Sequence, residues 1–323
     1  MNAILTILLL TLFVVLHELG HYISARRSKI AVSEFFVGFG PKIFSFKRNN
    51  TEYGLKAILL GGYVKIPGMD ENEPVSNYKK EELFHTASWK KKLYIASAGI
   101  LVNFFLAWII LFSIFAFYGI DQPTLEIATI GNSISNPNDD APSKKAGLMP
   151  GDFIYSFNGL EVNSWEELVS IIELNPEKDV SIGYIRNSQL YLTTTKLESR
   201  ALNNKPSGYL GVSPVLERQT LGLLQAIPAT TIVEIDMTKA AVKGIFTLFN
   251  PSTLGALLGT YTGEVIPDEV RPLSPIGLAQ AGDQIAEGGY VNLFSLLAFV
   301  NIFLAVFNSI PLVPLDGGRV VLA

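Results

Sequence analysis

The sequence predicts a polytopic α-helical membrane protein with a β-rich segment on the cytoplasmic side and a folded α+β domain on the outer side. The first observation behind this prediction is three long apolar runs, each able to cross a bilayer core of roughly 30 Å as a helix. The second is a difference in charge between the segments that connect them. Of 323 residues, 49% are hydrophobic and 17% are charged, below the roughly 25% of a soluble domain.

The first predicted span, within residues 1–30, runs from Asn2 to about Ala25. The second, within 93–120, is Leu93 to Tyr118, and the third, within 289–323, is Val291 to about Val313. A cleaved signal peptide has a basic start and a small-residue cleavage site. Here the basic residues follow the first run and no such site is evident, which favours a retained span.

The connecting segments set the predicted orientation. Between Arg26 and Lys92 there are thirteen Lys and Arg against seven Asp and Glu. Between Asp121 and Gly288 the counts are eleven against twenty. Because basic loops stay in the cytoplasm, we expect residues 31–92 inside, residues 121–288 outside and the amino terminus outside.

Residues 34–66 are rich in aromatic and β-branched residues, with a polar turn at residues 48–51 and a Gly61-Gly62-Tyr63 sequence near the end. This pattern predicts a small antiparallel sheet of three or four strands that rests on or dips into the membrane. Residues 67–85 are polar and carry Glu71, Glu73, Glu81 and Glu82. We expect them to form an exposed loop.

Residues 121–215 change to short strands and helices. The sequence from Asn163 to Glu167 has a capping-box shape and predicts a helix to about Leu174, and a strand is expected at 153–157. Two further strands are expected at 180–186 and 189–194, joined by a turn at Asn187 and Ser188. Residues 216–288 include an apolar stretch, Leu221 to Leu258, broken by charges. An interfacial or amphipathic helix fits this stretch better than a fourth span.

His17 and His21 are four residues apart on the first span, so both face one side of a helix and can bind one ion. Glu18 lies one step round and could act on a water bound to that ion. A chance pattern is the competing interpretation, but two of the chain's three histidines are here, and ionisable residues inside a span are usually functional.

A catalytic zinc needs three protein ligands and an open position. The chain has no cysteine, so the third ligand is expected to be a carboxylate on another span. Asp316 is the acidic residue at the end of the third apolar region, followed by two glycines that allow close backbone approach. The alternative is an ordinary helix-end or turn aspartate. The predicted topology puts Asp316 on the same cytoplasmic side as His17 and His21.

These residues carry a resemblance to a known family. His17-Glu18-Leu19-Gly20-His21 together with Asn308 to Gly318 resembles the bacterial site-2 proteases, in particular the regulator of sigma-E protease and its actinobacterial relatives. The resemblance covers nearly the whole chain. It includes residues 38–41, residues 61–65 and Leu273 to Gly277, and residues 121–215 look like a single PDZ domain with Lys145 to Leu148 and Gly151-Asp152 at typical positions.

The resemblance implies an intramembrane zinc metalloprotease in which His17, His21 and Asp316 bind Zn²⁺ and Glu18 is the general base. It implies that Asn308 holds the substrate backbone, and that the hairpin with Gly61, Gly62 and Tyr63 pairs with the unwound substrate. Gly99 and Asn103 match a second-span motif, although Ile100 stands where the family usually has proline. The family has a fourth span after the Leu315-Asp316-Gly317 motif, so we expect the chain ending at Ala323 to be partial.

The expected function is therefore hydrolysis of peptide bonds within the transmembrane segments of single-span proteins, such as anti-sigma factors or remnant signal peptides, in the bacterial inner membrane. The expected partners are these substrates and membrane lipid, not nucleic acid. A catalytically silent scaffold that binds partners through the PDZ domain is the alternative, and retention of Glu18 argues against it. A soluble zinc protease with a cleaved leader is excluded by the uncharged second and third spans. The PDZ domain could be a filter for pre-trimmed substrates, a dock or a spacer. The sequence predicts no oligomeric state.

Overall fold

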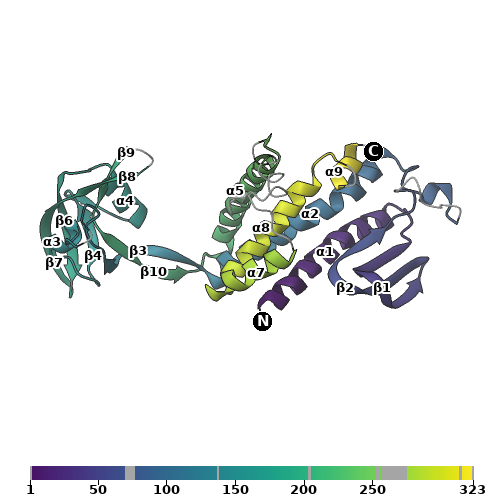
Figure 1. The fold of residues 1–323 in the computed structure, drawn as a ribbon, viewed down its shortest axis with the longest axis horizontal. Helices are drawn as coiled ribbons and strands as arrows, with labels where there is room; N and C mark the ends of the chain where they lie inside the picture. The colour runs from purple at the N-terminus through teal and green to yellow at the C-terminus, as the bar shows by residue number, and fades with distance from the viewer. Residues whose placement is uncertain are drawn as a thin grey trace. The chain divides into compact units, whose positions relative to one another are not determined.

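The computed structural model describes residues 2–69, 77–136, 138–202, 205–251, 253, 255, 275–312 and 315–321. The chain forms two compact units (Figure 1). One consists of residues 1–118 and 221–323, and the other of residues 119–220. Glu71, Glu73, Leu273 and Ser274 of the sequence motifs lie outside the described residues.

Three long apolar helices form the centre of the first unit. They are α1 (Asn2–Arg27), α2 (Trp89–Ser113) and α8 (Tyr290–Asn308), and α2 packs against both of the others (Figure 1). A π-helical turn, η2 (Ile114–Tyr118), continues α2. In the described part of the chain, Ala3–Arg27, Trp89–Tyr118 and Tyr290–Asn308 are the helices long and apolar enough to cross a membrane. The three predicted spans are thus confirmed as helices of that length and composition.

The third helix is shorter than predicted. We expected the span to continue to about Val313, but α8 ends at Asn308. Pro311 explains the early end, because proline has no N–H to donate and disfavours the helical conformation in the residue before it. After a turn, the chain starts a separate short helix, α9 (Asp316–Val321).

Two further helices pack around this centre. Helix α5 (Leu223–Leu248) contacts α8 and α2, and α7 (Pro275–Glu287) contacts α1 and α8. The described part of the region predicted as an interfacial helix therefore includes a 26-residue helix, α5. It is not among the three candidate spans of the described residues, because charged side chains interrupt its apolar sequence. Its place at the membrane interface stays a prediction.

The β-rich segment consists of β1 (Glu34–Arg48) and β2 (Thr51–Lys65), with the 3₁₀ turn η1 (Lys80–Glu82) later in the same region. The prediction of three or four strands was wrong in number, because two 15-residue strands bend without ending. Residues Glu34 to Val37 pair with both Glu52–Leu55 and Gly62–Lys65. The bends coincide with glycines in the left-handed region, including Gly38 (φ 84°) and Gly61 (φ 119°).

The second unit is built on a mixed-length antiparallel sheet in the order β10-β3-β4-β6-β7, with β5 paired to β4 and a separate β8–β9 hairpin. The strands are β3 (Ile120–Ile130), β4 (Phe153–Phe157), β5 (Leu160–Glu161), β6 (Asp179–Arg186), β7 (Gln189–Lys196), β8 (Glu198–Leu202), β9 (Lys205–Tyr209) and β10 (Val212–Gln219). Helices α3 (Pro142–Lys145) and α4 (Trp165–Glu173) complete it.

Local sequence signals account for several of these elements. Ser164 caps α4 by accepting a hydrogen bond from the Glu167 amide, as the capping-box pattern predicted. Asn187 and Ser188 both have positive φ, 50° and 63°, as the tight turn between β6 and β7 requires. The core of the unit is one cluster of buried apolar residues from its strands and helices, among them Ile154, Phe157, Leu168 and Ile182.

This core yields a first prediction. Replacing Ile182, which is fully buried, with alanine should lower the free energy of unfolding of the 119–220 unit by about 2–5 kcal/mol, because a cavity remains. Leu192→Ala is the matched control, since Leu192 on the neighbouring strand is 72% exposed and should change stability by less than about 0.5 kcal/mol. Urea unfolding of residues 119–220 measures both. Equal losses would contradict the core assignment.

Candidate metal centre

The candidate metal centre lies in the first unit, on α1 and at the start of α9. Three buried side chains, His17 (7% exposed), His21 (3%) and Asp316 (7%), come together there. The two Nε2 atoms are 3.2 Å apart. Asp316 Oδ2 is 3.2 Å from His17 Nε2 and 3.1 Å from His21 Nε2. The structure therefore groups the three residues that the sequence predicted as ligands.

The dimensions of this triangle fit a tetrahedral zinc ion. Zinc bonds of about 2.0–2.1 Å to nitrogen or oxygen place two ligand atoms of a tetrahedron about 3.3 Å apart. The three observed separations, 3.1–3.2 Å, are close to that value. Two imidazoles and one carboxylate are also a donor set that catalytic zinc uses, with the fourth position left open.

Hydrogen bonding alone does not account for the triangle when both imidazoles are neutral. Nδ1 of His21 is 2.7 Å from the carbonyl oxygen of Ile95, so this nitrogen carries the hydrogen and Nε2 presents a lone pair. That lone pair then faces a carboxylate oxygen of Asp316 at 3.1 Å, which is repulsive. A bound cation, or a protonated His21, turns the same contact into an attraction.

Helix α2 supplies two further parts of the site that are not side-chain donors. The Ile95 carbonyl orients the His21 ring, as an outer hydrogen bond to a metal ligand commonly does. Gly99, one turn further on, lies directly under both rings. A Cβ at this position would collide with His21 Nε2 and would lie 2.6 Å from His17 Cε1. The sequence motif drew attention to Gly99, but the backbone carbonyl of Ile95 carries no residue-specific signal.

Asp316 reaches the site from the first residue of α9 rather than from the third span itself. The turn after α8 folds back so closely that a side chain at position 317 is excluded. A Cβ on Gly317 would collide with the Ser309 carbonyl oxygen and lie 2.5 Å from that of Ile310. The glycine after Asp316 is therefore needed for the close backbone approach that the sequence suggested.

The carboxylate of Glu18 is held by strand β2. Its Oε2 accepts a hydrogen bond from the Val64 amide, at 3.0 Å. Seven residues earlier on α1, the Thr11 hydroxyl donates to the Leu59 carbonyl at 2.6 Å. These two bonds fix the last part of β2 alongside α1. One carboxylate oxygen of Glu18 is occupied, and the other is available for chemistry.

The residues expected to contact substrate occupy different surroundings. Gly61 and Gly62 pack on α1, where a Cβ would lie 3.4 Å from Val14 and Val15 respectively. Tyr63 donates a 2.5 Å hydrogen bond to Glu34, and burial together with this bond raises the pKa of its phenol above the usual range. Asn308 is the last residue of α8 and is half-buried.

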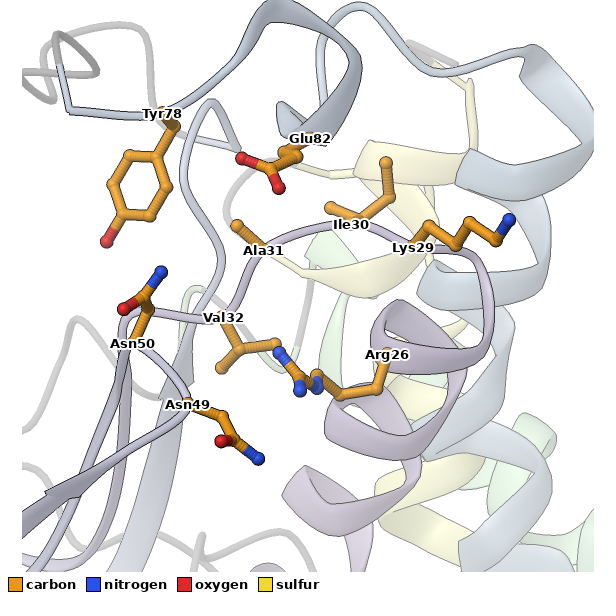
Figure 2. Close-up of a pocket in the computed structure, with 9 residues that line it drawn as sticks. All are labelled: Arg26, Lys29, Ile30, Ala31, Val32, Asn49, Asn50, Tyr78 and Glu82. Carbon is orange, nitrogen blue, oxygen red and sulfur yellow. The ribbon is translucent and has the colours of Figure 1, made fainter.

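A polar cavity of about 280 Å³ lies elsewhere in the first unit, beyond the C-terminal end of α1 (Figure 2). Arg26, Asn50 and Tyr78 border it, and no ligand of the candidate metal centre does. In Figure 2 the Arg26 guanidinium extends beneath Val32. This cavity is therefore separate from the metal centre and contributes nothing to it.

Comparison with known proteins agrees with this geometry. The family model "Peptidase family M50" matches residues 5–323. The chain belongs to this family. It is 28% identical to the "Regulator of sigma-W protease RasP" of Bacillus subtilis, over 94% of this chain and 84% of that protein. It is 29% identical to the "Zinc metalloprotease Rip1" of Mycobacterium tuberculosis, over 99% of this chain and 84% of that protein.

The M50 membership and these relatives make the chain a zinc metalloprotease of the site-2 type. A search of solved structures finds the PDZ domain of the SdrC-like protein Lmo2051 from Listeria monocytogenes, at 20% identity and a TM-score of 0.24. That match covers 30% of this chain and 92% of the other. The assignment of residues 121–215 to a PDZ domain stays a prediction.

The position of Gly99 leads to a second prediction. The purified Gly99→Ala protein should contain little zinc, because the new methyl group would displace both imidazoles from the position in which their Nε2 atoms can bind one ion. Gly244→Ala on α5 is the control, since a Cβ there meets nothing within 4 Å. Metal content by atomic emission, with circular dichroism as a check on folding, compares the two. A folded Gly99→Ala protein with full zinc would contradict the geometry.

Proposed function

We propose that this M50 protease hydrolyses peptide bonds inside the membrane, within the transmembrane segments of single-span proteins. The observation that carries the proposal is the position of the three grouped ligand atoms. Two of the ligands, His17 and His21, belong to a helix that is long and apolar enough to cross a membrane. A substrate bond cut at this site would have to reach the interior of the helix bundle.

In this proposal, His17 and His21 bind zinc through Nε2 and Asp316 through Oδ2. The separations of the three atoms and the outer hydrogen bond of His21 support this ligand set. When bound, a catalytic zinc supplies a Lewis acid that polarises the substrate carbonyl and acidifies water. The ligands of the chain hold the ion, and Gly99 leaves room for both rings.

Glu18 is the proposed general base. It would take a proton from the attacking water and return it to the leaving amide nitrogen. The Val64 amide holds Oε2, so Oε1 is the oxygen for proton transfer. A carboxylate fixed at one oxygen loses little further freedom in the transition state, which favours catalysis. A structural zinc site would have no use for this group.

Strand β2 and Asn308 are the proposed contacts for the substrate backbone. A transmembrane helix must unwind locally before its peptide bonds can be cut, and an edge strand can capture the extended form. Residues Gly61, Gly62 and Tyr63 lie on the part of β2 that runs beside Glu18. The side-chain amide of Asn308 would donate a hydrogen bond to the substrate backbone or to the developing oxyanion.

The proposed substrates are anti-sigma factors, remnant signal peptides or other single-span proteins, cut in the bacterial inner membrane. The printed name of the relative from Bacillus subtilis, a regulator of sigma-W protease, supports the first of these. We place the β1–β2 sheet and the metal centre toward the cytoplasm, and residues 121–215 outside. The charge counts of the two connecting segments support this orientation.

A third prediction tests Glu18 directly. Glu18→Gln should keep zinc and folding but abolish cleavage of a model transmembrane substrate, because the amide retains the contact to Val64 and removes the base. Replacing both His17 and His21 with alanine is the companion variant and should lose zinc as well as activity. Substantial turnover by a zinc-loaded Glu18→Gln protein would assign the proton transfer to another group.

A fourth prediction concerns topology. The chain has no cysteine, so a single introduced cysteine reports its own position without background. In intact spheroplasts, a cysteine at Asn187 should react with an impermeant thiol reagent, and one at Asn50 should react only after lysis. Both are exposed turn residues with positive φ, which makes them matched reporters. The reverse pattern would invert the proposed orientation.

We also propose that residues 121–215 act as a filter, which admits substrates already trimmed on the outer side. A filter only has to obstruct bulky outer domains and needs no contact with the metal centre. The second unit can be deleted by joining the two segments of the first unit, which lie close together where the chain leaves and re-enters it. The Leu221 amide donates to the Phe115 carbonyl at 2.9 Å, so a short linker can join the chain across the deleted residues 119–220.

The fifth prediction follows from that deletion. The shortened protein should still cut short, pre-trimmed substrates and should also cut full-length substrates that the intact protein rejects. Zinc content and resistance to a soluble protease control for folding. Loss of both substrates in a folded, zinc-loaded protein would make the domain a required dock. Unchanged selectivity would make it a spacer.

A further inference from the structure

Two buried polar atoms, Nδ1 of the proposed ligand His17 and Oδ1 of Asn103 on α2, have no hydrogen-bond partner in the structure. Both side chains are deeply buried, at 7% and 2% exposure. A buried polar group left without a partner is destabilising, because it has given up its hydrogen bonds to water. The two atoms are chemically complementary. When Nε2 of His17 faces an ion, Nδ1 carries the hydrogen and donates, whereas an amide oxygen accepts.

The packing of α1 against α2 places these two residues at the same level. The helices run in opposite directions, because Ala25 shares a buried cluster with Ile95, whereas Phe13 packs near Leu106. Between these points, a Cβ on Gly20 would touch Ala98 and Val102. His17 lies between Gly20 and Phe13 on α1. The backbone of His17 is therefore level with the part of α2 between Val102 and Leu106, one turn beyond Gly99, which contacts its ring.

Among the α2 residues at this level, Asn103 lies on the same helix face as the two residues that contact the histidines. Ile95, Gly99 and Asn103 are spaced four residues apart and so share one face of the helix. Ile95 accepts the hydrogen bond of His21, and Gly99 lies beneath both rings. One turn along α1 from His21 is His17, and one turn along α2 from Gly99 is Asn103. The same repeat that serves His21 thus supplies an acceptor for His17.

We propose that Asn103 is the positioning residue for His17: its Oδ1 accepts, through one bridging water, the hydrogen that Nδ1 of that imidazole donates. A metal-ligating histidine almost always donates its second ring hydrogen in this way, and the bond fixes which nitrogen faces the ion. A water can serve because it would find at least two polar partners there. The inference rests on the proposed ligand set and gives a role to the second-span motif.

The test is the zinc affinity of the full-length protein in detergent, measured by competition with a chelator of known affinity. Asn103→Leu should weaken zinc binding by about tenfold to a hundredfold, the usual effect of losing such an outer bond. Asn103→Asp keeps the acceptor and should bind zinc nearly as tightly as the parent protein. Asn301→Leu is the matched control and should leave affinity unchanged. Asn301, on α8, is equally buried and also has an unpartnered Oδ1.

Thermal unfolding of the metal-free proteins separates positioning from packing. Asn103→Leu removes an unpartnered polar atom, so the metal-free protein should be no less stable than the parent. Unchanged zinc affinity in Asn103→Leu would overturn the inference, as would equal losses in Asn301→Leu or failure of Asn103→Asp to restore binding. Failure of the parent protein to bind zinc at all would overturn the proposed function and this inference together.

Discussion

The grouping of His17, His21 and Asp316 is the interaction around which the helix bundle is arranged. Two imidazoles and a carboxylate buried among apolar helices cost free energy unless their polar atoms are bonded. The triangle of 3.1–3.2 Å contacts meets that requirement only with a positive charge at its centre or on a ring. A bound ion would therefore offset the free-energy cost of burying these polar groups where α1, α2 and α9 pack together.

Small residues make this arrangement possible where helices meet. Gly20 lets α1 approach the backbone of α2, since a Cβ there would lie 3.0 Å from the Ala98 carbonyl oxygen. Gly99 leaves room for the rings, and Gly317 for the turn that delivers Asp316. In lipid, where helices gain no hydrophobic free energy by associating, such close contact is a main source of packing energy. The same glycines thus serve stability and the site.

The sequence was sufficient for those features that have a side-chain signature. The spacing of His17 and His21 and the acidic residue before two glycines predicted which side chains come together, and the three apolar runs predicted the helices. The early end of α8 was missed, although Pro311 was visible, because hydropathy continues past the helix. The Ile95 carbonyl and the Val64 amide could not be predicted, because every residue has these groups and only the fold selects which ones face the site.

Strand β2 shows how the fold links the proposed base to the proposed substrate edge. Thr11 and Glu18 bind β2 at two points that are seven residues apart on α1, a rise of about 10 Å. The strand is thus aligned by the helix that carries both histidines, not by a flexible loop. A shift of α1 would move His17, His21, Glu18 and the bonded part of the strand together, whereas Asp316 belongs to α9. One helix thus fixes β2, the proposed substrate strand, relative to the two histidines, and such fixed orientation favours catalysis.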